Sequence, residues 1–251
     1  MVGALSMSLV LIFSGVAASD GPVGPEVEVV EISGLFDEIV ARLVADTLRS
    51  VDAADTLAVV FQIDSGGSVV VDDRIVELAD LIDASPVPVS FWIGPSGSRA
   101  IGHVAQLAAV AHDVGIAPGS RIGAFGDLVL PTDRYAVPFR SSVGGDLVAT
   151  SIDYHETVDR GLARPSPVLL EHLVGLDGFQ VVNEGSSVKP VTRTRFSQLD
   201  PIDQFFHSVA SPAITYLLFL AGMGLLVFEL YTAGVGVAGV VGGTSLILSG
   251  Y

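Results

Sequence analysis

The chain contains no cysteine and a single lysine, Lys189, among its 251 residues. The absence of cysteine excludes a disulfide framework and a thiolate metal site. Acidic residues outnumber basic ones, and the net charge is −16. Because nucleic-acid binding and attraction to anionic lipids both need basic patches, this charge balance argues against both.

Motifs for metal or cofactor binding are also missing from the sequence. There is no HExxH motif and no compact cluster of histidine and carboxylate residues. The histidines are spread along the chain at His103, His112, His155, His172 and His207. We therefore expect neither a metal ion nor another cofactor.

Both ends of the chain are apolar. Residues 1–19 form a short apolar run closed by small residues, which is typical of a signal peptide or an N-terminal anchor, although no basic residue precedes it. A buried N-terminal strand or helix is the alternative. From Ala213 to Tyr231 only Glu229 is charged, and the run is long enough to span a membrane. The Gly-rich apolar stretch from Gly234 to Tyr251 predicts a second membrane helix.

Between these ends, the apolar pattern alternates between that of strands and that of helices. Strands are predicted at residues 27–32, 57–63, 87–93 and 114–116. Helices are predicted at 35–51, from Asp72 or Asp73 to just before Pro86, and at 99–111, with a DSGGS turn at 64–68. Residues 126–164 show no periodic pattern. The order of elements predicts an α/β domain with mostly parallel strands.

A series of short motifs then points to a family. The motifs are, in order, Asp64-Ser65-Gly66-Gly67 after an apolar strand, Pro88-Val89, Gly97 with Ala100, Ala117-Pro118-Gly119-Ser120 followed by Ile122-Gly123-Ala124, LLEHLVGLDGFQV, and YLLFLAGMGLLVFELYTAGVGVAGVVGG. In this order they resemble the NfeD family, membrane-anchored proteins whose extracytoplasmic part is a ClpP-like serine protease domain. The resemblance covers most of residues 27–251.

The resemblance implies a ClpP/crotonase-like spiral of strands and helices, followed by C-terminal transmembrane helices. It divides the chain into four parts. These are a signal peptide or N-terminal anchor at 1–19, a ClpP-like domain at 26–185 that is shortened after residue 126, a juxtamembrane segment at 186–212, and a transmembrane region of NfeD type at 213–251.

The resemblance also implies a Ser/Lys dyad, in which lysine takes the serine proton and two backbone N–H groups stabilise the oxyanion. In this chain Gly102 stands at the position of the serine, and His103 follows it. No lysine lies in the region where the family has one, and Lys189 is expected at the surface close to the membrane. Both halves of the dyad are missing, so we expect a catalytically inactive homologue.

The glycines at Gly66 and Gly67 are the part of the family site that the chain retains. The resemblance implies that their backbone N–H groups face the carbonyl of a substrate or bind an extended peptide. The alternative is a tight turn, because glycine is the residue that such turns require.

Two other hypotheses remain open. The first is an active membrane-bound serine peptidase with a relocated nucleophile, Ser98 or Ser96, and His103 or Lys189 as the base. The second is a truncated, degenerate gene product, because the chain ends within an apolar segment.

The expected function is that of a binding or scaffold module in the cell membrane, with its globular domain outside the cytoplasm. Family resemblance implies flotillin-like or stomatin-like membrane proteins as partners. Peptide segments are possible ligands, nucleic acid is not expected, and a homo-oligomer is possible.

Overall fold

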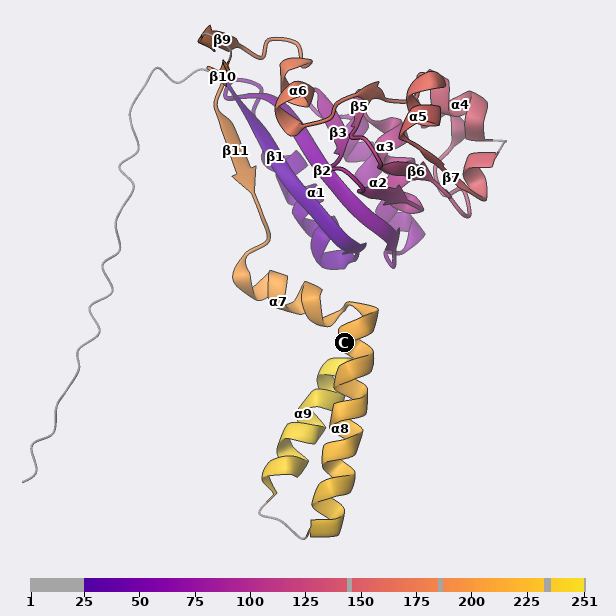
Figure 1. The fold of residues 1–251 in the computed structure, drawn as a ribbon, viewed down its shortest axis with the longest axis vertical. Coiled ribbons are helices and arrows are strands. Elements are labelled where there is room, and N and C mark those ends of the chain that lie inside the picture. The colour runs from indigo at the N-terminus through magenta and orange to yellow at the C-terminus, as the bar shows by residue number, and fades with distance from the viewer. Residues whose placement is uncertain (1–24, 144–145, 185–186, 233–235, 251) are drawn as a thin grey trace, which may run out of the picture.

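The computed structural model describes residues 25–143, 146–184, 187–232 and 236–250. An α/β domain forms one end of the molecule, and two long helices extend from it side by side (Figure 1). The predicted signal peptide or anchor at 1–19 lies outside the described residues.

The elements follow one another along the chain as strands and helices in alternation. The first half contains β1 (Glu26–Phe36), α1 (Glu38–Ser50), β2 (Thr56–Ser68), α2 (Asp72–Asp83), β3 (Val89–Ile93), β4 (Arg99–Ile101), α3 (His103–Val110), β5 (Asp113–Ile116) and β6 (Arg121–Gly123). The second half contains α4 (Val137–Val143), β7 (Ser151–Asp153), α5 (Tyr154–Asp159), β8 (Arg164–Pro165), α6 (Leu169–Val174), β9 (Val181–Glu184), β10 (Ser187–Pro190), β11 (Thr194–Ser197), α7 (Pro201–Val209), α8 (Pro212–Thr232) and α9 (Val237–Ser249).

The sheet is centred on β2, and in the described chain it contains nine strands. Strand β2 pairs in parallel with β1, β3 and β4, whereas β7 is antiparallel to β6. The apolar run of β2 is buried on both faces, because Val59, Val60 and Phe61 are fully covered. The expectation of an α/β domain with mostly parallel strands is therefore confirmed.

Helix α1 shows how the sequence positions a helix against this sheet. Asp37 caps its N-terminus by accepting hydrogen bonds from the backbone N–H groups of Ile39 and Val40. Val44 and Leu48 are buried on the side that faces the sheet. Burial of such side chains contributes roughly 1.5–3 kcal/mol each.

Three local predictions were wrong. The DSGGS segment is not a turn, because β1 continues to Phe36 and pairs with Ser68, which keeps β2 extended to that residue. The helix predicted at 99–111 begins only at His103, because residues 99–101 form β4 between β2 and β6. Asp72 and Asp73 do not cap α2; they lie in its first turn, and the N-cap is Val71.

The aperiodic segment after residue 126 is fastened to α3 by Gln106, which is fully buried. Its amide nitrogen donates hydrogen bonds to the backbone oxygens of Phe125 and Asp127, at 3.0 and 2.9 Å. Its amide oxygen accepts hydrogen bonds from the backbone N–H of Val129 and from the hydroxyl of Tyr135. These hydrogen bonds connect the segment to α3, and side chains of the segment such as Leu130, Tyr135 and Phe139 are buried in the core as well.

Substituting Gln106→Ala is expected to lower the free energy of unfolding by about 2 kcal/mol, because buried backbone groups lose their partners. Urea unfolding of the full chain in detergent measures the loss. Gln180→Ala is the matched control, since the side chain of Gln180 is exposed. Equal stabilities of the two variants would show that Gln106 does not hold the segment.

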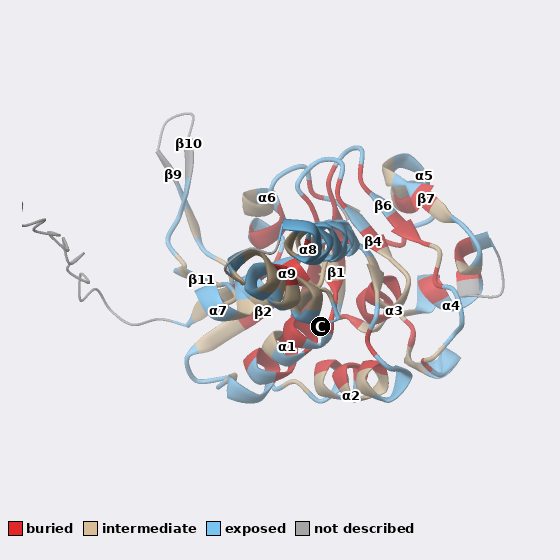
Figure 2. Ribbon diagram, turned by 90° about the horizontal axis from the view of Figure 1, so that it is seen from below, coloured by how far each residue is buried: buried red, intermediate tan, exposed pale blue. Residues whose placement is uncertain are grey.

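Helix α8 has a mean hydropathy of 2.0, and 6% of its apolar window is buried, so it is long and apolar enough to cross a membrane. Figure 2 shows how much of α8 is exposed. Helix α9 is shorter and packs closely against it, since a Cβ added at Gly222 would lie 2.8 Å from the backbone oxygen of Gly242. Glu229, the charged residue of α8, accepts a hydrogen bond from the backbone N–H of Gly236 at the start of α9. The carboxylate therefore caps the second helix of the hairpin.

Candidate functional site

The residue that the motifs align with the family nucleophile, Gly102, lies in a sharp turn from strand β4 into helix α3. Gly102 occupies this turn with φ 70° and ψ −134°, and its N–H donates a hydrogen bond to the backbone oxygen of Gly123. A Cβ built on Gly102 would meet no atom within 4 Å, so a side chain here would point into open space. Hydrolases often present a nucleophile on a strained strand-to-helix turn of this kind. The turn is present, and glycine gives it no reactive group.

Gly66 and Gly67 lie on the strand next to this turn. Ser65 of β2 is paired with Ala100 of β4, two residues before Gly102. A Cβ on Gly67 would meet nothing within 4 Å, so no neighbouring atom crowds this position. The structure therefore brings the two glycines and the Gly102 turn to adjacent strand ends.

Arg99 is a residue of this region that the motifs did not indicate. Its guanidinium lies 3.3–3.6 Å from the place where Gly66 would carry a Cβ. The backbone N–H of Arg99 donates to the carboxylate of Asp64 at 3.1 Å. Only the pairing of β2 with β4 brings these residues together, and no sequence spacing reveals that pairing. The end of β2 at Gly66 thus has the positive charge of Arg99 beside it.

His103, the neighbour of Gly102, faces helix α2. Its Nε2 lies 3.9 Å from the carboxylate of Asp72, whose side chain is exposed. Its Nδ1 is buried and has no hydrogen-bond partner in the described chain. With no serine at position 102, this imidazole has no neighbouring hydroxyl to activate there.

The two alternative nucleophiles lie at the other end of β4. Ser98 is buried, its N–H donates to the backbone oxygen of Pro95, and its carbonyl accepts from the N–H of Arg121. Ser96 is exposed in the preceding turn. The whole of β4 separates both serines from Gly102.

Lys189 lies far from the site. It is exposed on the β9–β10 hairpin, at the end of the domain opposite to α8 and α9 (Figure 1). The expectation that it lies close to the membrane was wrong. The chain turns back after this hairpin, and β11 runs along β1 before α7 begins. Strand β11 therefore belongs to the sheet, although residues 186–212 were predicted as a juxtamembrane segment.

A second polar group lies inside the domain, and the sequence did not indicate it. His172 of α6 is fully buried, with its Nε2 2.8 Å from the hydroxyl of Ser90. That hydroxyl donates to Asp113, which also accepts two hydrogen bonds of 2.9 Å from Arg164. Serine, histidine and aspartate are the residue types of a catalytic triad. Ser90 is fully buried as well, so its hydroxyl is not accessible to a substrate.

The charges of this group follow from its burial. Desolvation, with the nearby Arg164 cation, lowers the pKa of His172 to about 4, so the ring is neutral at pH 7. Burial alone would raise the pKa of Asp113, but the hydrogen bonds from Arg164 and Ser90 outweigh it and lower that pKa. The group fastens α6 to β3, β5 and β8. A further histidine, His112, accepts a hydrogen bond at its Nδ1 from the backbone N–H of Val89.

The arrangement of strands and helices is that of the ClpP/crotonase-like class, as the motifs predicted. The chain is similar to the 1510-N membrane protease specific for a stomatin homolog from Pyrococcus horikoshii, with a TM-score of 0.59 and 15% identity over 75% of this chain and 100% of that one. It is also similar to a lysine-to-alanine mutant of the 1510-N membrane-bound stomatin-specific protease in complex with a substrate peptide (TM-score 0.54, 16% identity, 74% and 97% covered). By sequence, no family model and no curated protein matches the chain.

Proposed function

We propose that this protein is a membrane-anchored, NfeD-like homologue of a ClpP-like protease that binds peptide segments and does not hydrolyse them. The observation that carries the proposal is the open Gly102 turn, which has the backbone of a nucleophile turn and no side chain. The only lysine of the chain, Lys189, lies at the far end of the domain. Nucleophile and base are thus both missing from one site.

Binding remains chemically feasible at the same place. The end of β2 pairs with β1 at Ser65 and Ser68, with an irregularity at the two glycines between them, and its pair with β4 is at Ser65. An extended peptide can hydrogen-bond to an open strand edge of this kind. A stomatin-like or flotillin-like membrane protein is the partner that we propose, because the similar protease is specific for a stomatin homolog. We also propose that the domain lies outside the cytoplasm, as the family resemblance implies.

Loss of hydrolysis is tested on the purified full chain with a fluorophosphonate probe. We expect no labelling of the wild type. We also expect no peptide cleavage by Gly102→Ser, because a serine there still lacks a base and is strained at positive φ, at a cost of about 1–3 kcal/mol. Labelling of the wild type that disappears in Ser98→Ala or Ser96→Ala would instead establish a working peptidase with a relocated nucleophile.

Peptide binding is tested by fluorescence anisotropy with tiled peptides from stomatin-like and flotillin-like proteins. Gly67→Val is expected to weaken binding at least about ten-fold, or about 1.4 kcal/mol, because the valine side chain fills the open space beside the strand edge and strains the backbone at φ 158°. Ala54→Val is the matched control, since Ala54 is exposed near the opposite end of β2. If both variants bind equally well, the peptide does not lie along Gly66 and Gly67.

A further inference from the structure

Exposed apolar side chains gather where the domain meets the membrane helix. On α7, Ile202 is 67% exposed and Phe205 is 53% exposed. In the loop between β2 and α2, Val69 is 65% exposed and Val71 is 69% exposed. We call these four residues the apolar rim. Its two parts are far apart in sequence and lie at the same end of the domain as the start of α8 (Figure 1).

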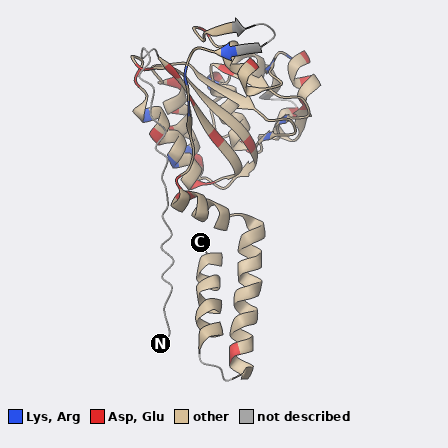
Figure 3. Ribbon diagram, turned by 60° about the vertical axis from the view of Figure 1, so that its left-hand side comes forward, with Lys and Arg blue, Asp and Glu red and all other residues tan. Residues whose placement is uncertain are grey.

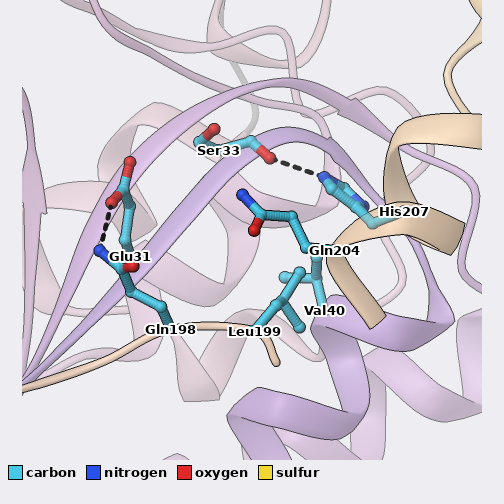
Figure 4. A pocket seen from close by; sticks show the side chains of 7 residues that line it. All are labelled: Glu31, Ser33, Val40, Gln198, Leu199, Gln204 and His207. Carbon is cyan, nitrogen blue, oxygen red and sulfur yellow. Dashed lines mark hydrogen bonds between the residues drawn. The ribbon is translucent and has the colours of Figure 1, made fainter. Parts of the chain in front are cut away.

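Helix α7 has one side attached to the domain. Nδ1 of His207 lies 2.7 Å from the carboxylate of Asp37, and its Nε2 lies 3.0 Å from the backbone oxygen of Ser33. Gln204 lies on the same side and lines a small pocket with Glu31 (Figure 4). The polar face of α7 is therefore turned toward the domain.

The other side of α7 carries the apolar rim residues. Ile202 and Phe205 are three positions apart, which places them together on a helix and roughly opposite to His207. Phe205 also packs edge-on against Phe206. An apolar face that turns away from the domain needs another apolar environment to cover it.

The loop between β2 and α2 lies at the level where α8 begins. Val69 and Glu38 of the domain line a cavity of about 560 Å³ together with Pro212 and Thr215, which belong to the first turn of α8. None of the described residues lining this cavity is a lysine or an arginine. The chain from residue 196 to residue 216 also contains no lysine or arginine. Figure 3 shows acidic residues at this end of the domain and no lysine or arginine on α7, α8 and α9.

We propose that the apolar rim inserts into the headgroup boundary of the bilayer that α8 crosses, so that α7 lies in the membrane surface and the domain rests on lipid. Continuity with α8 identifies the occupant: α7 ends at Val209 and the membrane-spanning helix starts at Pro212. A helix with one polar and one apolar face is the form that lies in this interface. The cavity lining and residues 196–216 contain no lysine or arginine, and Arg74, three residues after Val71, is paired with Glu38 and Glu77. The contact is therefore apolar and needs no anionic lipid.

The absence of cysteine makes a direct test possible, because single cysteines can be labelled without background. Val69→Cys, Val71→Cys, Ile202→Cys and Phe205→Cys are each labelled with a polarity-sensitive fluorophore in the full chain, in nanodiscs of phosphatidylcholine. Val137→Cys and Val168→Cys are the controls, since they are 73% and 50% exposed on parts of the domain remote from α8. Intrinsic fluorescence of Trp92 checks that every labelled variant is folded.

The rim labels are expected to emit at shorter wavelength than the controls and to be quenched by nitroxide lipids labelled just below the headgroup. Replacing part of the phosphatidylcholine by phosphatidylserine should leave this quenching unchanged. Rim labels that behave like the controls would overturn the proposal. Labels that are shielded from water and not quenched by the lipid would overturn it as well, because a second copy or another protein would then cover the rim. Quenching that requires phosphatidylserine would contradict the apolar contact.

Discussion

Replacing Gly115 by alanine is expected to destabilise the domain by about 3 kcal/mol. The added Cβ would lie 2.2 Å from Nδ1 of His172 and 2.8 Å from the hydroxyl of Ser166. The imidazole cannot move aside, because it is fully buried and held by Ser90. Urea unfolding can be followed through Trp92, the single tryptophan, whose indole N–H donates to the backbone oxygen of Ser166.

A double-mutant cycle separates this clash from a general effect on β5. In a His172→Ala background the ring is gone, so Gly115→Ala should cost much less there than in the wild type. His172→Ala alone is expected to destabilise, because it leaves a cavity and unpaired hydroxyls. If Gly115→Ala is equally costly in both backgrounds, contact with His172 is not the reason for glycine at this position.

The sequence predicted best those elements that are determined by local apolar pattern. Strands β2 and β3 and helix α1 were found because their runs and periodicities reflect burial on two faces or on one face. Strand β11 was not found, because TRFS is short and mixed in polarity, and only its pairing with β1 makes it a strand. The segment after residue 126 was not predicted either, because its buried side chains, such as Leu130 and Phe139, follow no regular period and Gln106 holds it through polar contacts.

The candidate site was predicted from motifs, and its chemistry depends on contacts that motifs do not contain. Gly66, Gly67 and Gly102 were indicated by resemblance, and the pairing of Ser65 with Ala100 brings their strands together. Arg99 beside Gly66 was missed, because strand register decides which side chain lies next to that glycine. His172 was one of five scattered histidines in the sequence, and only the tertiary structure buries it.

Acid is expected to destabilise the domain through His172. The pKa of His172 is about 4 in the folded protein, compared with an ordinary value of 6.5. Between these pH values the unfolded chain binds a proton at this ring and the folded protein does not, so stability falls as the pH falls from 6.5 to about 4. The full displacement corresponds to roughly 3 kcal/mol. Urea unfolding at several pH values measures it.

His207 acts in the opposite direction, so its contribution has to be separated. The hydrogen bond to Asp37 raises the pKa of His207, against the effect of burial. Its stabilisation is therefore fully present below pH 6.5 and is lost as the pH rises through the raised pKa. His207→Gln removes this term, which changes only above pH 6.5, so the loss of stability between pH 6.5 and 4 should remain in that variant. In His172→Gln the loss of stability between pH 6.5 and 4 should largely disappear; an unchanged pH dependence in that variant would mean that His172 is not the group that acid titrates.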